Sequence, residues 1–225
     1  MVSADRTLLR LHVEAVWGVQ LSPFTSNDLE LAPQSARPAW KLCVAAIATG
    51  RVHIWRPDVN IAEREDLRLR ADEALVFPPI APIPGVSREV ALSQIAAPRL
   101  DIATARGIAR PLTLNDRELI ERFFAPGDSL EDNTHPHIGV VVAGRLLCLA
   151  HSSRRTPEAC ELGIETLPEA RRKGYALAAT ILWAHAVAQE GLVPIYSAFA
   201  ENTASLRLAD AAGYRAFARI AVFEG

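Results

Sequence analysis

The chain has 225 residues, of which 50% are hydrophobic and 22% are charged, a composition that excludes a disordered chain. Lys and Arg number 24 against 26 for Asp and Glu, which gives a formal net charge of −2. A nucleic-acid-binding protein normally carries a basic excess, so we expect no nucleic acid among the partners of this protein.

The cysteines and the N-terminus indicate the compartment. Cys43, Cys148 and Cys160 are odd in number and lack the close spacing of metal ligands, which predicts buried free thiols, a reducing compartment and no metal site. No apolar run reaches the roughly 18 residues of a membrane span. The opening residues, MVSADRTLLR, carry charges where a signal peptide has its apolar stretch. We therefore expect a cytoplasmic protein with no membrane partner.

The N-terminal part is predicted to be rich in strands, at residues 8–19, 44–48 and 52–55. Five prolines then fall between residues 77 and 98. Proline has no N–H for a helix or a sheet, so this stretch predicts a linker or an extended crossover. We accordingly expect an N-terminal region, 1–98, and a C-terminal domain, 99–225.

A weak internal repeat links the two parts. PFTSNDLEL at residues 23–31 matches PLTLNDREL at residues 111–119 in six of nine positions. Either the N-terminal region is a degenerate copy of the domain, or both segments are turns that lead into helices, which favour these residues in any case. The N-terminal region has no copy of the glycine-containing loop described below, so we expect no second active site there.

The C-terminal part shows clearer local signals. Turn and cap residues bound short β-rich runs and three helical runs. The predicted strands are 107–113, 138–142, 146–150, 159–167, 193–199 and 214–223, and the predicted helices begin at Asn115 or Asp116, at Tyr175 and at Thr203. This mixture of elements predicts an α+β domain.

A basic loop precedes the long helix that begins at Tyr175. Its sequence is Arg171-Arg172-Lys173-Gly174-Tyr175-Ala176. The first N–H groups of a helix have no partner within the helix and lie at the positive end of its dipole, which suits a phosphate. Gly174 lets the backbone approach a ligand closely. A basic helix start is also common as a merely solvated feature.

The basic loop is the second of three motifs that follow one another in the C-terminal part, and the three together are more specific than the loop alone. Residues 107–223 resemble the GNAT superfamily of acyl-CoA-dependent N-acyltransferases. The motifs are Leu162–Arg171, which resembles the family's fourth strand and its exit; Arg171-x-x-Gly174-x-Ala176, which resembles its pyrophosphate loop; and Asn202-x-x-Ser205-x-x-Leu208 followed by Ala212-Gly213-Tyr214. The resemblance covers about half of the chain and does not extend to the first hundred residues.

The resemblance implies a fold and a cosubstrate. The fold is a mixed, mainly antiparallel sheet with splayed fourth and fifth strands, flanked by helices, plus a small β-rich N-terminal region. The cosubstrate is acetyl-CoA. Its pantetheine arm would pair with the main chain at Glu165, Thr166 and Leu167, and its pyrophosphate would lie on the loop from Arg171 to Ala176. Asn202 and Ser205 would contact the cosubstrate, cap the next helix, or do both.

The same resemblance suggests catalytic roles. Glu161 is the candidate general base, and its alternative role is that of a solvent-facing strand residue. His151 and His137 are rival bases. Many family members have a tyrosine acid where this chain has Ala209, so the acid is missing, unnecessary, or replaced by Tyr196 or Tyr214.

The acceptor is expected to be a small-molecule amine or amino acid. In the family it enters near the segment that here spans residues 123–136, where Asp128, Glu131 and Asp132 would favour a cationic amine. Two other functions stay open, a non-catalytic acyl-CoA sensor and a peptide or tRNA-linked acyltransferase. The N-terminal region could cover the acceptor entrance or form a homodimer surface.

Overall fold

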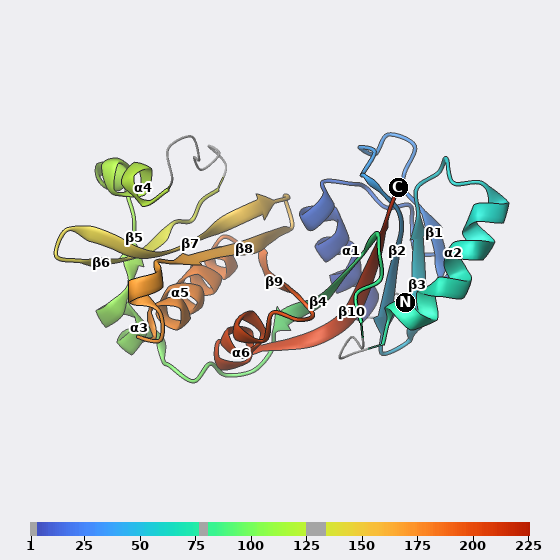
Figure 1. Ribbon diagram of the computed structural model, residues 1–225. Coiled ribbons are helices and arrows are strands. Elements are labelled where there is room, and N and C mark those ends of the chain that lie inside the picture. The colour runs from blue at the N-terminus through green and yellow to red at the C-terminus, as the bar shows by residue number, and fades with distance from the viewer. Residues whose placement is uncertain (1–3, 77–80, 125–133) are drawn as a thin grey trace. The chain divides into compact units, whose positions relative to one another are not determined.

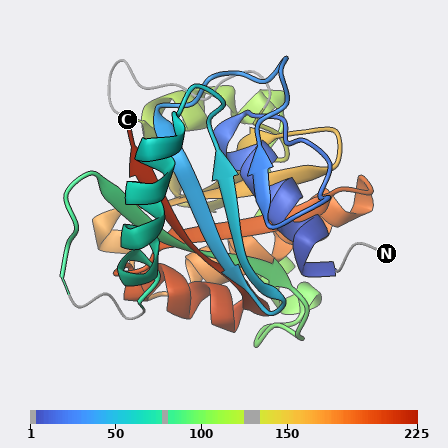
Figure 2. The same ribbon diagram turned by 90° about the vertical axis from the view of Figure 1, so that its right-hand side faces the viewer.

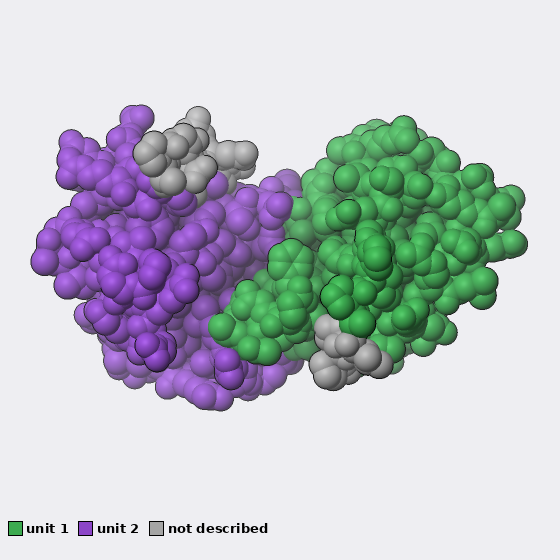
Figure 3. Space-filling view, in the orientation of Figure 1, with its two compact units in different colours: residues 1–93, 197–206, 216–225 green, residues 94–196, 207–215 purple. Residues whose placement is uncertain are grey.

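The computed structural model describes residues 4–76, 81–124 and 134–225 (Figure 1). The chain forms two compact units, which Figure 3 colours separately. Unit 1 comprises residues 1–93, 197–206 and 216–225, and unit 2 comprises residues 94–196 and 207–215. The structure therefore divides the chain differently from the single boundary expected near residue 98, because C-terminal segments return to unit 1.

Unit 1 is built on a sheet with strand order β1-β3-β2-β10-β4. Its β2–β3 hairpin is antiparallel, β1 runs parallel to β3, and β10 runs antiparallel to β2. The elements are α1 (Ala4–Trp17), β1 (Asp28–Glu30), β2 (Trp40–Ile47), β3 (Gly50–Trp55), α2 (Ile61–Ala74), β4 (Val86–Gln94) and β10 (Tyr214–Glu224).

Buried side chains of β2 alternate between the two faces of this sheet, which explains why one helix covers each face. Cys43 and Ala45 are buried in a cluster with Leu9 and Val13 of α1. Leu42 and Val44 are buried in a second cluster with Leu67 and Ala71 of α2. Successive strand side chains point to opposite faces, so the two sets cannot mix. Figure 2 shows α2 in front of these strands and α1 behind them.

Two N-terminal expectations were wrong, and one helix was missed. The predicted strand at 8–19 is helix α1, because the apolar residues that its buried face uses, Leu9, Val13 and Val16, follow helical spacing. Helix α2 was not expected. The proline-rich stretch contains strand β4, five residues of which are buried, whereas Pro78 and Pro79 lie outside the described residues.

The two matching nonapeptides adopt different local structures. Residues 28–30 of the first form strand β1, whereas residues 114–116 of the second form a single 3₁₀ turn that leads into α4. The hairpins that follow are alike, since each turns at a glycine with positive φ, Gly50 or Gly144. The sequence match therefore reflects shared turn residues rather than a shared local fold.

Unit 2 has the strand order β9-β8-β7-β6-β5. All neighbouring strands are antiparallel except β8 and β9, which are parallel. The elements are α3 (Ile102–Ile108), β5 (Arg110–Pro111), η1 (Leu114–Asp116), α4 (Arg117–Phe123), β6 (Ile138–Val142), β7 (Arg145–Arg155), β8 (Ala159–Thr166), η2 (Pro168–Ala170), α5 (Tyr175–Gln189), β9 (Val193–Phe199) and α6 (Thr203–Ala211). The end of β9 and the start of α6, within residues 197–206, belong to unit 1.

The predicted hairpin and the long helix are confirmed here, but the strand predicted at 107–113 shortens to Arg110–Pro111 because α3 extends to Ile108. The two faces of the sheet differ. Leu149 packs with the apolar side chains of α4, and Trp183 of α5 donates its indole N–H to Ser152 of β7 at 3.3 Å. Helices α4 and α5 therefore cover opposite faces, and the open end of β8 lies between them.

Candidate functional site

The two parallel strands of unit 2 separate after a short contact. β8 pairs with β9 from Ala159 with Val193 to Glu161 with Ile195. Within the described residues this pairing stops there, although β8 continues to Thr166. The second half of β8 therefore has an open edge of main-chain groups, the splayed arrangement that a bound chain could complete as another strand would.

The register of β8 decides which groups face that edge. The Leu167 N–H donates to Leu147 of the preceding hairpin at 3.0 Å, and Glu165 stands opposite Leu149 in the same register. Because a strand alternates its hydrogen-bonding direction residue by residue, Ile164 and Thr166 face the open edge instead. The main-chain groups of Glu165 and Leu167, which were expected to pair with the arm, are directed to β7. The contact expected at Thr166 stays a prediction.

The loop after β8 forms a concave set of N–H donors. Arg172 and Gly174 both have positive φ, +62° and +80°, and Gly174 is the N-cap of α5 with no side-chain cap hydrogen bond. In the described part of the chain, the N–H groups of residues 172–177 meet no acceptor. Successive N–H groups in this conformation form a nest for an anion, and the helix dipole adds to it.

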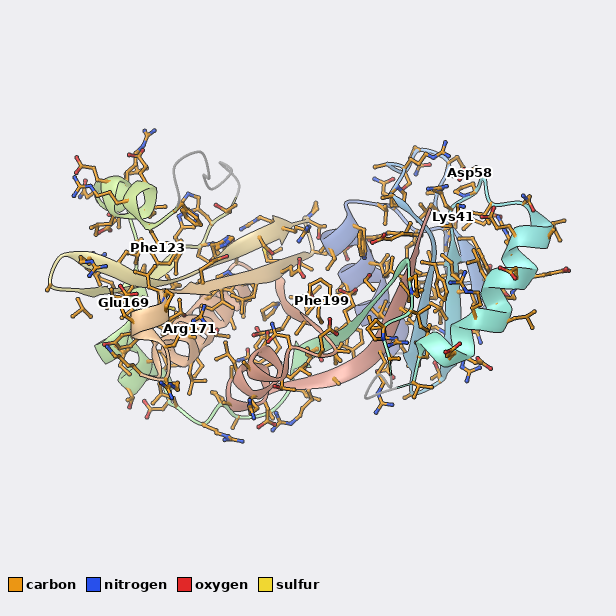
Figure 4. The ribbon with its side chains drawn as sticks, in the orientation of Figure 1. Lys41, Asp58, Phe123, Glu169, Arg171 and Phe199 are labelled. Carbon is orange, nitrogen blue, oxygen red and sulfur yellow. The ribbon has the colours of Figure 1, made fainter. Side chains whose placement is uncertain are left out.

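Positive charge surrounds the nest. Arg171, Arg172 and Lys173 are exposed, and within the described ranges none of them forms an ion pair. Glu169, just before them, instead bonds Arg145 at 3.1 Å. Figure 4 labels Arg171 and Glu169 at this corner of unit 2. A multiply charged anion such as a diphosphate fits these residues.

A histidine–carboxylate pair lies on the α4 face beside the open edge. The His151 Nε2 lies 3.2 Å from the Glu165 carboxylate, and His151 is buried while the Glu165 side chain is 44% exposed. The two residues can meet because Gly163 lies between them: a Cβ there would be 2.4 Å from His151 Nε2. His151 and Glu165 were both candidates from the sequence. Gly163 was not, because only the strand register places it opposite His151.

The second candidate histidine has a different environment. The His137 Nε2 lies 2.7 Å from the Thr134 hydroxyl, and the His137 ring is 4.3 Å from the His135 ring. Burial, followed by the nearby His135 and His151, lowers the pKa of His137 to about 4. His137 is therefore neutral at pH 7 and resists taking a proton.

Glu161 shares the face of Glu165 but is held by an arginine. It is 5% exposed, and its carboxylate accepts hydrogen bonds from Arg154 at 3.1 Å and Ser153 at 3.3 Å. Both donors bind the carboxylate that would have to accept the proton of the amine. Glu161 therefore lies on β8 with its carboxylate already bound by two neighbouring side chains.

The candidate tyrosine acids are both buried. The rings of Tyr196 and Tyr214 pack edge to face at 5.3 Å. Tyr214 is fully buried, and burial first, with Tyr196 second, raises its pKa far above the usual range. A proton held there has no exposed path to a leaving group, so we leave Tyr214 out of the proposed mechanism. Ala209 is also fully buried.

Asn202 and Ser205 belong to unit 1 and lie at the start of α6. The Asn202 side-chain oxygen accepts from the Ser205 N–H at 3.1 Å, which is the capping role considered above. The acidic residues Asp128, Glu131 and Asp132 lie outside the described residues.

The described residues contain no group of three or more His, Cys, Asp or Glu placed to hold a metal ion. Nor does any described helix combine the length and apolar character needed to cross a membrane.

Residues 117–222 match the family model described as GNAT acetyltransferase. This part of the chain belongs to the GNAT family. The GNAT domain so defined contains the open edge of β8, the 171–176 loop and the His151–Glu165 pair.

Solved structures agree with this placement. A GNAT-family protein from Novosphingobium aromaticivorans is 26% identical, with a TM-score of 0.50 over 65% of this chain and 70% of that chain. An acetyltransferase of the GNAT family from Colwellia psychrerythraea is 15% identical, with a TM-score of 0.51 over 76% and 75%. A GCN5-related N-acetyltransferase from Sphaerobacter thermophilus is 17% identical, with a TM-score of 0.50 over 84% and 61%. The last two show the fold alone, and no curated protein matches the chain.

Proposed function

We propose that the GNAT domain transfers an acetyl group from acetyl-CoA to a primary amine of a small molecule or amino acid. The observation that carries the proposal is the open edge of β8, which leads through Thr166 to the N–H groups at the start of α5 that meet no acceptor in the described part of the chain. An arm that pairs like a strand and ends in a diphosphate matches both features in order.

Acetyl-CoA would supply the acyl group as an activated thioester. The N–H groups of residues 172–177 would hold its diphosphate, with Arg171, Arg172 and Lys173 contributing charge attraction. Ile164 and Thr166 would pair with the arm, and one of these main-chain N–H groups would donate to the thioester oxygen as negative charge develops there. The cosubstrate contacts that the family resemblance implies for Asn202 and Ser205 stay a prediction.

The amine must lose a proton before it attacks the thioester carbon. Glu161 is the proposed base from its place on β8, and the His151–Glu165 pair is the rival on the same face. The Glu161 carboxylate is already bound by Arg154, whereas the His151 ring lies 3.2 Å from the Glu165 carboxylate. The departing CoA thiolate is a tolerable leaving group, so the mechanism needs no tyrosine acid at Ala209.

The function is tested by ligand stabilisation and by thiol release. Acetyl-CoA at 100 times its Kd should stabilise the protein by about 2.7 kcal/mol, and free CoA thiol should then appear only when amines are added. Gly174→Glu should abolish the thermal shift, because it places a carboxylate in the anion nest. Gly144→Glu is the matched control, since Gly144 also has positive φ and open space around it. Equal shifts in both variants would refute the binding site.

A separate variant tests the base. Glu161→Gln should lower kcat by about 10²–10⁴-fold if Glu161 takes the proton, while the acetyl-CoA thermal shift stays unchanged. His151→Asn, measured in parallel, should behave like the wild type in that case. If instead Glu161→Gln is fully active and His151→Asn is not, the proton goes to His151.

One observation favours a second function, an acyl-CoA sensor without turnover. Ala209 occupies the place where many family members have their acid. Acetyl-CoA would then stabilise the protein, but no amine would release thiol. The thiol-release assay described above distinguishes the two functions.

A further inference from the structure

Unit 1 contains a cavity that the proposed acetyl transfer does not use. Its volume is about 450 Å³, within the range of small-ligand sites. It is bounded by the start of β4 and by the residues that follow β9, where the Ala200 N–H donates to Arg88 at 3.0 Å. The lining residues are Ala81, Pro82, Val86, Ser87, Arg88, Phe199 and Glu201.

Arg88 is the unusual member of this lining. It is 8% exposed, and its Nε and Nη1 donate to the carbonyl oxygens of Ala74 and Ala81 at 2.9 and 2.8 Å. Of its five N–H donors, three have no acceptor among the described residues, and no described carboxylate pairs with it. A guanidinium binds a carboxylate through two parallel N–H bonds, so the remaining donors of Arg88 can hold an anion at the cavity wall.

The rest of the lining indicates what accompanies that anion. Phe199 is a large apolar side chain that is 58% exposed, and it is labelled at the end of β9 in Figure 4. Pro82 and Val86 add apolar surface. Glu201 is exposed and also forms no ion pair within the described ranges, so it lies more than 4.0 Å from the Arg88 guanidinium. Arg88 and Glu201 thus line the same cavity with opposite charges but form no ion pair with each other.

We propose that this cavity binds a small apolar amino acid as its zwitterion. The carboxylate takes the free N–H donors of Arg88, which suit the two oxygens of a carboxylate. The ammonium group lies toward Glu201, and the side chain packs on Phe199 and Pro82. The lining residues all belong to unit 1, and occupation of the cavity requires no acyl donor.

Calorimetric titration without acetyl-CoA tests the site with three related probes. L-Phenylalanine should bind most tightly, 3-phenylpropionate more weakly because it lacks the ammonium group, and phenylalaninamide not measurably because it lacks the carboxylate. Binding of the amide as tight as that of the amino acid would overturn the proposal. Absence of binding by all three probes would overturn it as well.

Substitutions assign the contacts. Arg88→Met removes the anion site but also two bonds to carbonyl groups, so the exposed residues provide the safer test. Phe199→Ala should weaken phenylalanine binding at least tenfold, and Glu201→Gln should weaken phenylalanine but leave 3-phenylpropionate unchanged. The matched controls Leu69→Ala and Glu65→Gln change exposed residues of α2 and should alter neither. Wild-type affinity in both Phe199→Ala and Glu201→Gln would refute the proposal, whatever the GNAT domain does.

Discussion

At the scale of single residues, Gly163 shapes the face of the GNAT domain that carries the candidate bases, because glycine has no side chain. Gly163 stands opposite His151 on the neighbouring strand. Because Gly163 has no Cβ, the imidazole can lie over the strand and reach Glu165, two residues further along. A strand interior normally disfavours glycine, and its presence there often marks a close approach of another group.

Gly163→Ala should therefore displace the His151 ring. The added Cβ would lie 2.4 Å from His151 Nε2, and relief of that overlap should cost about 1–3 kcal/mol of the free energy of unfolding. Urea denaturation measures the loss. If His151 is the base, the acetyl-transfer rate should fall as well, while acetyl-CoA still stabilises the variant.

Gly107→Ala provides the control. Gly107 lies within α3 and has no neighbour within 4 Å of the added Cβ, so alanine should leave stability unchanged or slightly raised. An unchanged stability in Gly163→Ala would show that the ring is not held over this glycine.

At the scale of elements, two helix starts in unit 2 differ in how their N–H groups are satisfied. The segment that leads into α4 has a capping box, in which Thr113 and Asp116 satisfy each other's N–H groups, and Asp116 also bonds Arg110 at 2.6 and 2.9 Å. Helix α5 begins at Gly174 with no side-chain cap. One start is satisfied internally, and the other keeps its donors available to an anion.

The capped start predicts a pH dependence of stability. The Arg110 hydrogen bonds, followed by the Thr113 N–H, hold the pKa of Asp116 far below its usual value. A depressed pKa stabilises the fold at pH values above the unfolded-state pKa of about 3.9, and this stabilisation is lost as the pH falls toward the folded-state value.

Asp116→Asn should accordingly lower the free energy of unfolding by about 1–2 kcal/mol at pH 7. Urea denaturation at pH 7, 5, 4 and 3 should show the gap to the wild type constant down to about pH 5 and narrower at pH 3. Arg117→Gln, at an exposed ion pair, is the control and should change stability little. A gap that is independent of pH would contradict the role of this carboxylate.

At the scale of the whole molecule, neither unit is a continuous stretch of chain. Unit 1 consists mainly of residues 1–93 but takes residues 216–225 as well. These include most of β10, which lies between β2 and β4 in its sheet. Ile220 of this strand is fully buried in the same cluster as Leu9 and Cys43. The last ten residues therefore complete the core formed by the first hundred.

Ile220→Asp should destabilise unit 1 by about 3–5 kcal/mol, because it buries an unpaired charge in that core. Tryptophan fluorescence follows the change, since Trp17, Trp40 and Trp55 are in unit 1 and Trp183 is in unit 2. Ala216→Asp, at an exposed position of the same strand, should be nearly silent. Equal stability of the two variants would contradict the place of β10 in unit 1.

Elements with local signals could be predicted from the order of the amino acids. The hairpin around Gly144 has its own turn residues, and α5 has a glycine at its start and a continuous run of apolar residues. The order of three short motifs was enough to indicate the GNAT family. In α1 the same reasoning failed, because the run from Leu11 to Ala15 alternates like a strand, while burial against the sheet selects the helical spacing of Leu9, Val13 and Val16.

Contacts between residues of different helices and strands could not be predicted in this way, because they depend on the folded chain. The strand register directs Ile164 and Thr166, rather than Glu165 and Leu167, to the open edge, and it lays His151 over Gly163. The cavity at Arg88 joins residues more than a hundred positions apart. Turns and caps depend on near neighbours along the chain, whereas register, burial and charge pairing depend on partners that are brought close only when the chain folds.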